Sequence, residues 1–129
     1  SGMGSMAQVE ENLATFAGFT PLEPEETELL ARAAAELRRR TNNGCTGCEY
    51  CMPCPAGVDI PENFSLWNRL ARCRDASLLW RSWNEVLKDE AKGKHCVGCG
   101  RCEEACPQHL PIRADLARAQ AALDAVPRP

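Results

Sequence analysis

The chain has 129 residues, 44% of them hydrophobic and 26% charged, which predicts a soluble globular protein of one domain. Its formal net charge of −3 at pH 7 argues against the basic surface that nucleic acids bind. It has neither an apolar run near the ~20 residues that cross a bilayer nor a signal-like segment at residues 1–6, so we expect a cytoplasmic protein without a membrane partner.

The first third of the chain predicts two helices. Apolar residues at helical spacing predict a short helix over residues 6–19, which Gly18 ends. A longer helix is predicted from Pro24, because proline is tolerated in the first turn and the glutamates after it favour the positive pole. The arginines at 38–40 suit its negative pole, and the Asn-Asn-Gly sequence at 42–44 ends it.

Three further helices are predicted, and almost no strand. Pro61 opens a helix with one apolar face, which residues 74–75 break. The next helix is predicted to reach about residue 91, and Pro111 begins the last one. The inward positions expected for these two helices are Leu78, Leu79, Trp83, Val86 and Leu87, then Ile112, Leu116, Ala119 and Leu123. The sequence therefore predicts an all-α fold with two cysteine-rich loops.

Nine cysteines are the unusual feature of the composition, and eight of them form two tight runs. The first run is Cys45, Cys48, Cys51 and Cys54, followed by Pro55. The second run is Cys96, Cys99, Cys102 and Cys106, followed by Pro107. An odd count in a chain without an export signal argues against a disulfide framework. Three thiolates spaced two residues apart can instead wrap three corners of a 4Fe-4S cluster.

In two-cluster ferredoxins the fourth cysteine of each run ligates the other cluster. Transferred to this chain, that rule assigns cluster one to Cys45, Cys48, Cys51 and Cys106. It assigns cluster two to Cys96, Cys99, Cys102 and Cys54. The second run has the bacterial spacing throughout, whereas the first run has only two residues before Cys54, which leaves the role of that cysteine open. Zinc is the alternative metal, but triplets with a trailing Cys-Pro do not resemble the paired C-x2-C of structural zinc sites.

Several residues around the runs carry their own expectations. Gly47, Gly98 and Gly100 are expected to let backbone N–H groups approach the sulfurs. Cys73, in mid-helix, is expected to be a small buried apolar residue. His95 and His109 are expected at the surface, with a hydrogen bond to a cluster sulfur as the alternative. Trp67, Trp80 and Trp83 are expected in the core, where they would keep water from the clusters.

The two cysteine motifs carry a family resemblance. The sequences CTGCEYCMPCPAGVDIP at 45–61 and CVGCGRCEEACPQHLP at 96–111 resemble the C-terminal ferredoxin domain of iron–sulfur-containing aldo/keto reductases. The resemblance implies an alpha-helical ferredoxin-like domain over residues 21–129. It also implies that residues 1–20 are the end of a reductase barrel, in its last loop and helix. Gln8, Glu11 and Asn12 would then contact NADP(H), but only in an intact full-length reductase.

The reductase chemistry of that family is not expected in this chain. The resemblance implies a catalytic tyrosine with Lys, Asp and His partners on barrel strands. The chain's one tyrosine, Tyr50, lies inside a cysteine loop, and no eightfold alternation of strand and helix is present. The chain is therefore not expected to be an enzyme on its own. Its expected partner is a redox protein or the missing N-terminal barrel domain.

Three functions are compatible with two cysteine runs. The leading hypothesis is an electron-transfer module that passes single electrons between a donor and a partner. The alternative is structural: the clusters staple a small helical interaction domain, because metal binding supplies folding energy that its core lacks. A catalytic cluster with an open iron is the third, and it requires one of the eight cysteines, with Cys54 the first suspect, to be no ligand.

Overall fold

The structure is a computed structural model that describes residues 2–72 and 75–129. Cys73, Arg74 and Ser1 lie outside the described residues, and with them the expectations of a buried thiol at 73 and of a helix break at 74. The described residues contain helices and no β-strand, which confirms the all-α fold. By their contacts, the residues form two units, Ser1–Glu36 and Leu37–Pro129.

The first unit contains the helix α1, Met6–Ala17, and most of α2, Pro24–Arg39. Ser5 and Gln8 form a capping box at the start of α1, and Gly18 caps its end, as predicted. Pro24 and the acidic first turn begin α2, and its last turn is basic. Neither helix has a buried residue, and several of their apolar side chains are exposed, among them Phe16 at 69% exposure and Leu30 at 55%.

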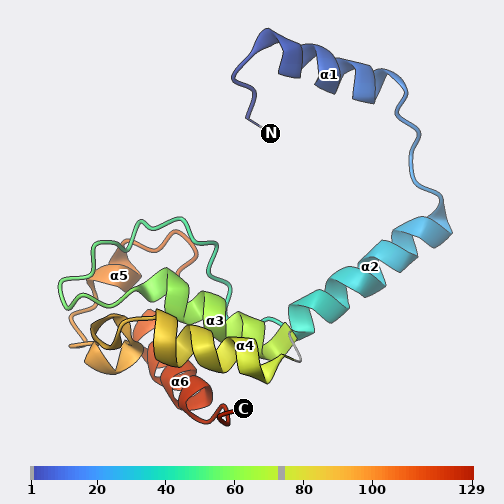
Figure 1. Ribbon diagram of the computed structural model, residues 1–129. Coiled ribbons are helices and arrows are strands. Elements are labelled where there is room, and N and C mark those ends of the chain that lie inside the picture. Colours follow the sequence, from blue (N-terminus) through green and yellow to red (C-terminus); the bar gives the residue numbers. More distant parts are fainter. Residues whose placement is uncertain (1, 73–74) are drawn as a thin grey trace. The chain divides into compact units, whose positions relative to one another are not determined.

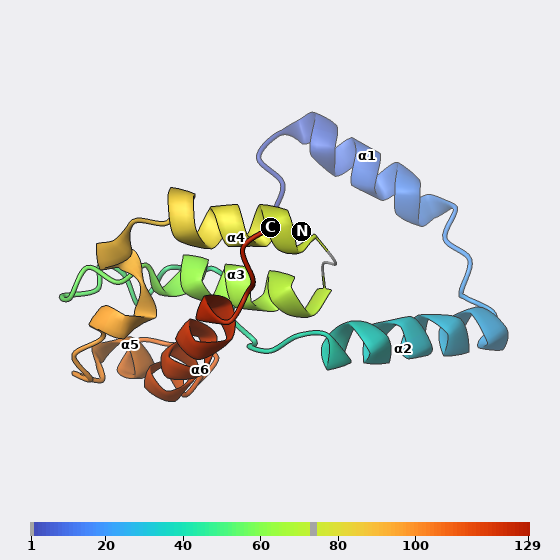
Figure 2. The same cartoon turned by 60° about the horizontal axis from the view of Figure 1, so that its bottom comes forward.

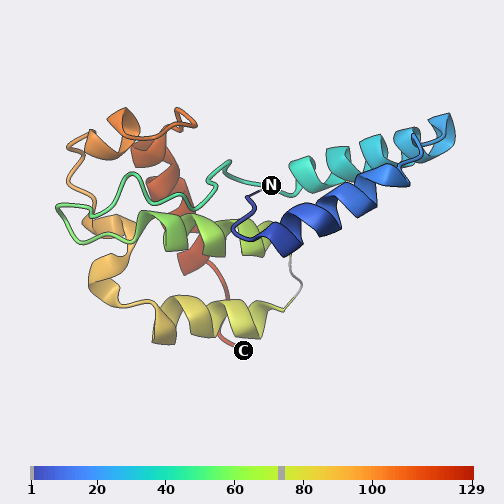
Figure 3. The ribbon, with the colours of Figure 1, turned by 90° about the horizontal axis from the view of Figure 1, so that it is seen from above.

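The second unit contains the remaining elements. In chain order these are α3 (Ile60–Arg72), α4 (Ala76–Arg81), η1 (Ser82–Val86), η2 (Asp89–Ala91), η3 (Gly93–His95), α5 (Arg101–Glu104) and α6 (Ile112–Asp124). α3 packs against both α4 and α6, and Figure 2 shows α6 crossing beside α3. The cysteine loops, drawn in green and orange, lie on the same side of this unit (Figures 1 and 3).

Two groups of buried side chains form the core of the second unit. One surrounds Phe64 and Leu116, and the half-buried cysteines of both loops pack against it. The other surrounds Trp83, which is fully buried and donates from Nε1 to Asp124 Oδ1 at 2.9 Å. The predicted inward positions of the last helix are all buried: Ile112, Leu116, Ala119 and Leu123. Of the three tryptophans expected in the core, Trp67 and Trp80 are half-buried.

The prediction that the helix beginning near residue 76 continues to residue 91 is wrong at its C-terminal end. α4 ends at Arg81, and the chain then widens into a π-helical turn, η1, that stops at Val86. Leu78 and Val86 were expected to face inward but are 51% and 76% exposed. The wider turn advances each residue by a smaller angle than an α-helix does, so α-helical spacing no longer predicts that Val86 is buried. Leu78 lies in α4, before the wider turn, and the turn does not account for its exposure.

Candidate metal centres

The two cysteine loops share one backbone pattern. The glycine before the second cysteine of each loop has a positive φ, 70° at Gly47 and 71° at Gly98. The residue after that cysteine is also left-handed, with φ of 64° at Glu49 and 82° at Gly100. Both loops therefore turn in the same way around their first three cysteines. Three of these four left-handed positions are glycine, which has no Cβ to clash with the backbone in that conformation.

Replacing Gly98 with alanine should destabilise the second loop. Nothing lies within 4 Å of an added Cβ, so the whole cost comes from the left-handed backbone, about 1–2 kcal/mol. The measurement is chemical denaturation of the metal-loaded protein. Gly44→Ala is the control, because its Cβ meets only Leu110 at 3.6 Å and its φ is outside the left-handed region. Equal loss of stability in both variants would contradict the conformational explanation.

The first cavity lies under the first cysteine loop. The cysteines that line it are Cys45, Cys48, Cys51 and Cys106. Three of them come from the first run, and the buried Cys106 comes from the end of the second. Ile60, Phe64 and Ile112 supply apolar walls. The structure thus brings together the four residues that the crossed-ligation rule assigned to cluster one.

The second cavity lies under the second cysteine loop. Its cysteines are Cys96, Cys99 and Cys102 of the second run, Cys54 of the first, and Cys51, which also lines the first cavity. These include the four residues assigned to cluster two. Despite the short spacing before it, Cys54 lines this cavity together with the cysteines of the second run.

The donor set around each cavity suits iron and sulfide. The first cavity offers four thiols, and the second offers four besides Cys51, which lines both. Thiolate is the ligand that iron–sulfur clusters take. Burial raises the pKa of the Cys51 and Cys102 thiols, so a metal that binds them displaces protons that they otherwise hold. Within residues 2–72 and 75–129, no three His, Cys, Asp or Glu side chains lie close enough to hold a single ion.

A buried asparagine anchors the first loop to two helices. Asn43 is 4% exposed, and its side-chain amide donates to Asp115 Oδ2 of α6 at 2.7 Å. Its Oδ1 accepts the backbone N–H of Cys45 at 2.8 Å, and Asn68 of α3 bonds its backbone N–H and carbonyl. The sequence predicted residues 42–44 to be a helix end, whereas Asn43 positions the first cysteine of the loop. Next to it, the Gly47 N–H donates to Cys45 Sγ at 3.5 Å, as expected for this glycine.

A second buried asparagine anchors the chain that leads into the second loop. Asn63 of α3 is fully buried and donates to the carbonyls of Asp59 and Ala91, at 2.6 and 2.8 Å. Its Oδ1 accepts the Gly93 N–H at 2.9 Å. A Cβ on Gly93 would lie 3.0 Å from the Leu116 carbonyl, so glycine permits the close approach to α6. Sequence analysis missed Asn63, although a lone amide on the apolar face of a helix is the signal for such a role.

An arginine of α6 is linked to the second loop. Arg113 donates from Nε and Nη2 to Glu103 Oε2 at 2.9 and 2.7 Å, and its backbone N–H donates to Glu103 Oε1 at 2.9 Å. Its Nη1 reaches the Gly98 carbonyl at 3.4 Å. This pairing lowers the pKa of the Glu103 carboxyl. Neither residue stood out in the sequence, because nothing local indicates that a residue of the short helix α5 will pair with a residue of α6 ten positions later.

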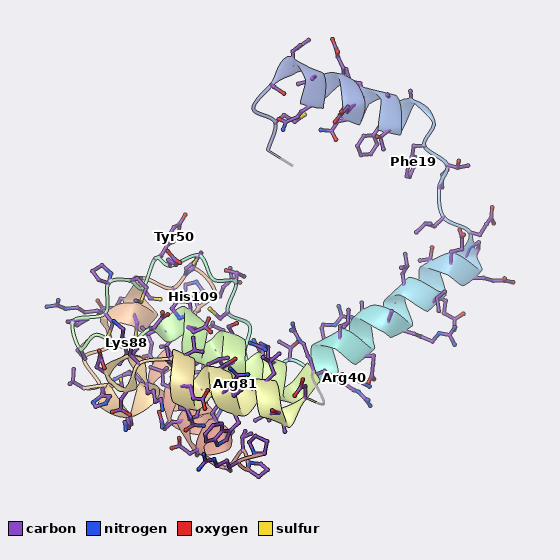
Figure 4. All side chains as sticks on the ribbon, viewed as in Figure 1. Phe19, Arg40, Tyr50, Arg81, Lys88 and His109 are labelled. Atoms are coloured by element: carbon purple, nitrogen blue, oxygen red, sulfur yellow. The ribbon has the colours of Figure 1, made fainter. Side chains whose placement is uncertain are left out.

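The other expected site residues, Gly100 excepted, do not line the two cavities, and three of them belong to the first unit. His95 is exposed and contacts Asp89 Oδ2 at 3.1 Å, and His109 is exposed beside the loops with φ of 51° (Figure 4). Gln8 serves the start of α1, where its Oε1 accepts the backbone N–H groups of Gly4 and Ser5. Glu11 is exposed and Asn12 half-buried in the same helix. Gly98 and Gly100 supply turns, as described above.

Comparison with known families yields one match in this region. The 4Fe-4S dicluster domain family matches residues 44–110, just over half of the chain, including both cysteine runs. No solved structure matches the chain significantly. None of the described helices is long and apolar enough to cross a membrane.

Among curated proteins, similarity is found to acetyl-CoA decarbonylase/synthase complex subunit alpha 1 of three Methanosarcina species. The M. barkeri protein is 36% identical and the M. acetivorans protein 38% identical over 69 residues, which are 53% of this chain and 7% of each relative. The M. mazei protein is 34% identical over 76 residues, 58% of this chain and 8% of its own length. The matched region is therefore less than a tenth of the length of these relatives.

Proposed function

Because the chain belongs to the 4Fe-4S dicluster domain family, we propose that its two cavities each hold a 4Fe-4S cluster and that it passes single electrons between a donor and a partner protein. One observation carries the proposal. Each cavity is lined by the first three cysteines of one run and the last cysteine of the other. Four thiolates complete the ligation of such a cluster and leave no iron open, so transfer of electrons fits the site better than catalysis at iron.

The ligands of the first cluster are then Cys45, Cys48, Cys51 and Cys106. Those of the second cluster are Cys54, Cys96, Cys99 and Cys102. Cys51 and Ile60 line both cavities, so the two clusters would be neighbours with only a residue or two between them. An electron that reduces one cluster can pass to the other, which regenerates the oxidised form of the first.

The surface of the loops suits the entry and exit of electrons. Cys48 in the first loop and Cys99 in the second are exposed, so each cluster would have one ligand at the surface. Tyr50 and Val97, each 71% exposed, lie beside these cysteines, and Figure 4 shows the Tyr50 side chain pointing away from the loop. Apolar and aromatic side chains next to a redox centre suit brief contact with a partner protein.

The parent protein is a finer part of the proposal. The motif resemblance supports an aldo/keto reductase-type oxidoreductase, in which residues 1–20 end a barrel and residues 21–129 form the ferredoxin-like domain. Gln8, Glu11 and Asn12 would meet NADP(H) only there, and the exposed apolar residues of α1 agree with a helix that packs on a further domain. The Methanosarcina relatives, named as subunits of a complex, support protein partners more generally.

A structural role is the second candidate, and one observation favours it. The partly buried cysteines pack against the Phe64 and Leu116 core, and the last cysteine of each run reaches the other run's cavity. Crossed ligation would therefore tie residues 45–54 to residues 96–106, and cluster binding would stabilise the fold. The two roles are distinguished by whether the clusters change oxidation state.

The first experiment counts iron, acid-labile sulfide and zinc in anaerobically purified protein, and then titrates it potentiometrically with electron paramagnetic resonance. We expect about eight iron and eight sulfide per chain, the sum of two four-iron clusters, and reversible one-electron reduction of each. Full iron without reduction at any accessible potential would leave the structural role. Zinc without sulfide would refute both roles of the clusters and leave a helical domain that zinc stabilises.

A further inference from the structure

The charged residues around the two cavities differ in sign. Arg101 and Arg113 line the second cavity, whereas Glu49 is the charged residue that lines the first. Arg69 and Arg72 line a separate cleft beside Cys45 and line neither cavity. Arg72 is held there by the Arg40 carbonyl and the Thr41 hydroxyl, at 3.3 and 2.6 Å.

Arg113 is the better fixed of the two cations at the second cavity. Its guanidinium is held by Glu103 and by the Gly98 carbonyl, and the position of a Cβ on Gly100 lies 4.0 Å from its Cζ. Gly98 and Gly100 flank Cys99, so this charge lies against the backbone of the ligand loop. Reduction adds one negative charge to a cluster that thiolates already make anionic, and a nearby cation stabilises that form.

We infer that Arg113 sets the reduction potential of the second cluster, holding it above that of the first, so that an electron entering the domain settles on the second cluster. The inference rests on the proposed function, since it assumes a redox-active cluster in each cavity. Arg113 would neither ligate the cluster nor react. Its positive charge would stabilise the reduced form. Glu103 holds the guanidinium in place and offsets part of that charge, so the two residues should act on the potential with opposite signs.

Replacement of each partner separates charge from mechanical support. Arg113→Gln removes the cation and should lower the reduction potential of the second cluster. We expect a shift of about 59 mV for one electron, which is a tenfold change in the ratio of reduced to oxidised cluster at a given potential. Glu103→Gln removes the anion and should raise that potential. Both variants break the same ion pair. If Arg113 only supported the loop, both would therefore shift the potential in the same direction.

Redox titrations of the full chain, followed by electron paramagnetic resonance, provide the measurement. Arg81→Gln is the matched control, since it also breaks an exposed Arg–Glu pair, with Glu85 at 3.3 Å, and neither residue lines a cavity. Opposite shifts confined to the second cluster support the inference. Shifts of the same sign, no shift, or an equal shift of the first cluster overturn it.

Two further results keep the test decisive. The wild-type titration comes first: if it shows no redox-active pair, the proposed function fails before any variant is compared. If the wild-type protein has both clusters and the variants do not shift, only the role of Arg113 fails. If the Arg113→Gln protein does not bind the second cluster, the test uses Arg113→Lys and Glu103→Gln instead. Arg113→Lys must then keep the wild-type potential, and Glu103→Gln must raise it. Any other result overturns the inference.

Discussion

Alanine in place of both Cys54 and Cys99 should leave the protein with the same iron content as either single replacement, about four per chain. The two residues come from different runs but line the same cavity, so losing one ligand already removes the second cluster and losing the other adds nothing. Iron and sulfide analysis of the single and double variants, purified without oxygen, measures this directly.

The matching double variant combines Cys54→Ala with Cys48→Ala, two cysteines of one run that line different cavities. It should lose both clusters and retain almost no iron. The reverse pattern, with iron kept when both residues come from one run, would mean that each run ligates its own cluster. Cys73→Ser is the control among the cysteines, because Cys73 belongs to neither run, and it should leave the iron content unchanged.

Asn63→Ala should reduce the free energy of unfolding of the loaded domain by about 2–4 kcal/mol. The variant removes three hydrogen bonds and leaves the buried Gly93 N–H without its acceptor. Because residue 93 precedes Cys96 by three positions, the second loop should loosen and the second cluster should be lost first during denaturation. Unfolding followed by circular dichroism and by cluster absorbance measures both effects.

Asn84→Ala is the matched control for this effect. Asn84 also donates from its amide to a backbone carbonyl, that of Trp80 at 3.0 Å, but it is exposed and makes one such bond. Its loss should change stability little, because water replaces the partner. If Asn63→Ala were as mild as Asn84→Ala, the buried amide would not be what holds α3 to the second loop.

Local patterns predicted most of the helices correctly, because their causes are local. A capping residue, an acidic first turn and apolar spacing of about 3.6 residues all act within one helix, and the last helix shows the expected buried face. The prediction that failed is the α-helix across η1, and the contacts that accompany η1 come from remote parts of the chain. Trp83 is buried against Asp124 and beneath Lys92 Nζ, 4.8 Å from its ring, while the apolar Val86 remains exposed. No pattern within residues 76–91 indicates those partners.

By itself, the sequence determined the metal chemistry of this protein. The first three cysteines of each run lie on one short loop, separated by two residues, and glycines occupy most of its left-handed positions. Their spacing depends on nothing outside that loop. The crossed-ligation rule predicted which distant cysteine faces each loop, but what brings that cysteine there is the tertiary structure. Packing of α3 on α6 and the Asn43–Asp115 bond, across 72 positions, bring Cys106 to the first cavity. The same packing places Arg113 at the second, because charge and contact between remote residues depend on the folded chain and not on spacing.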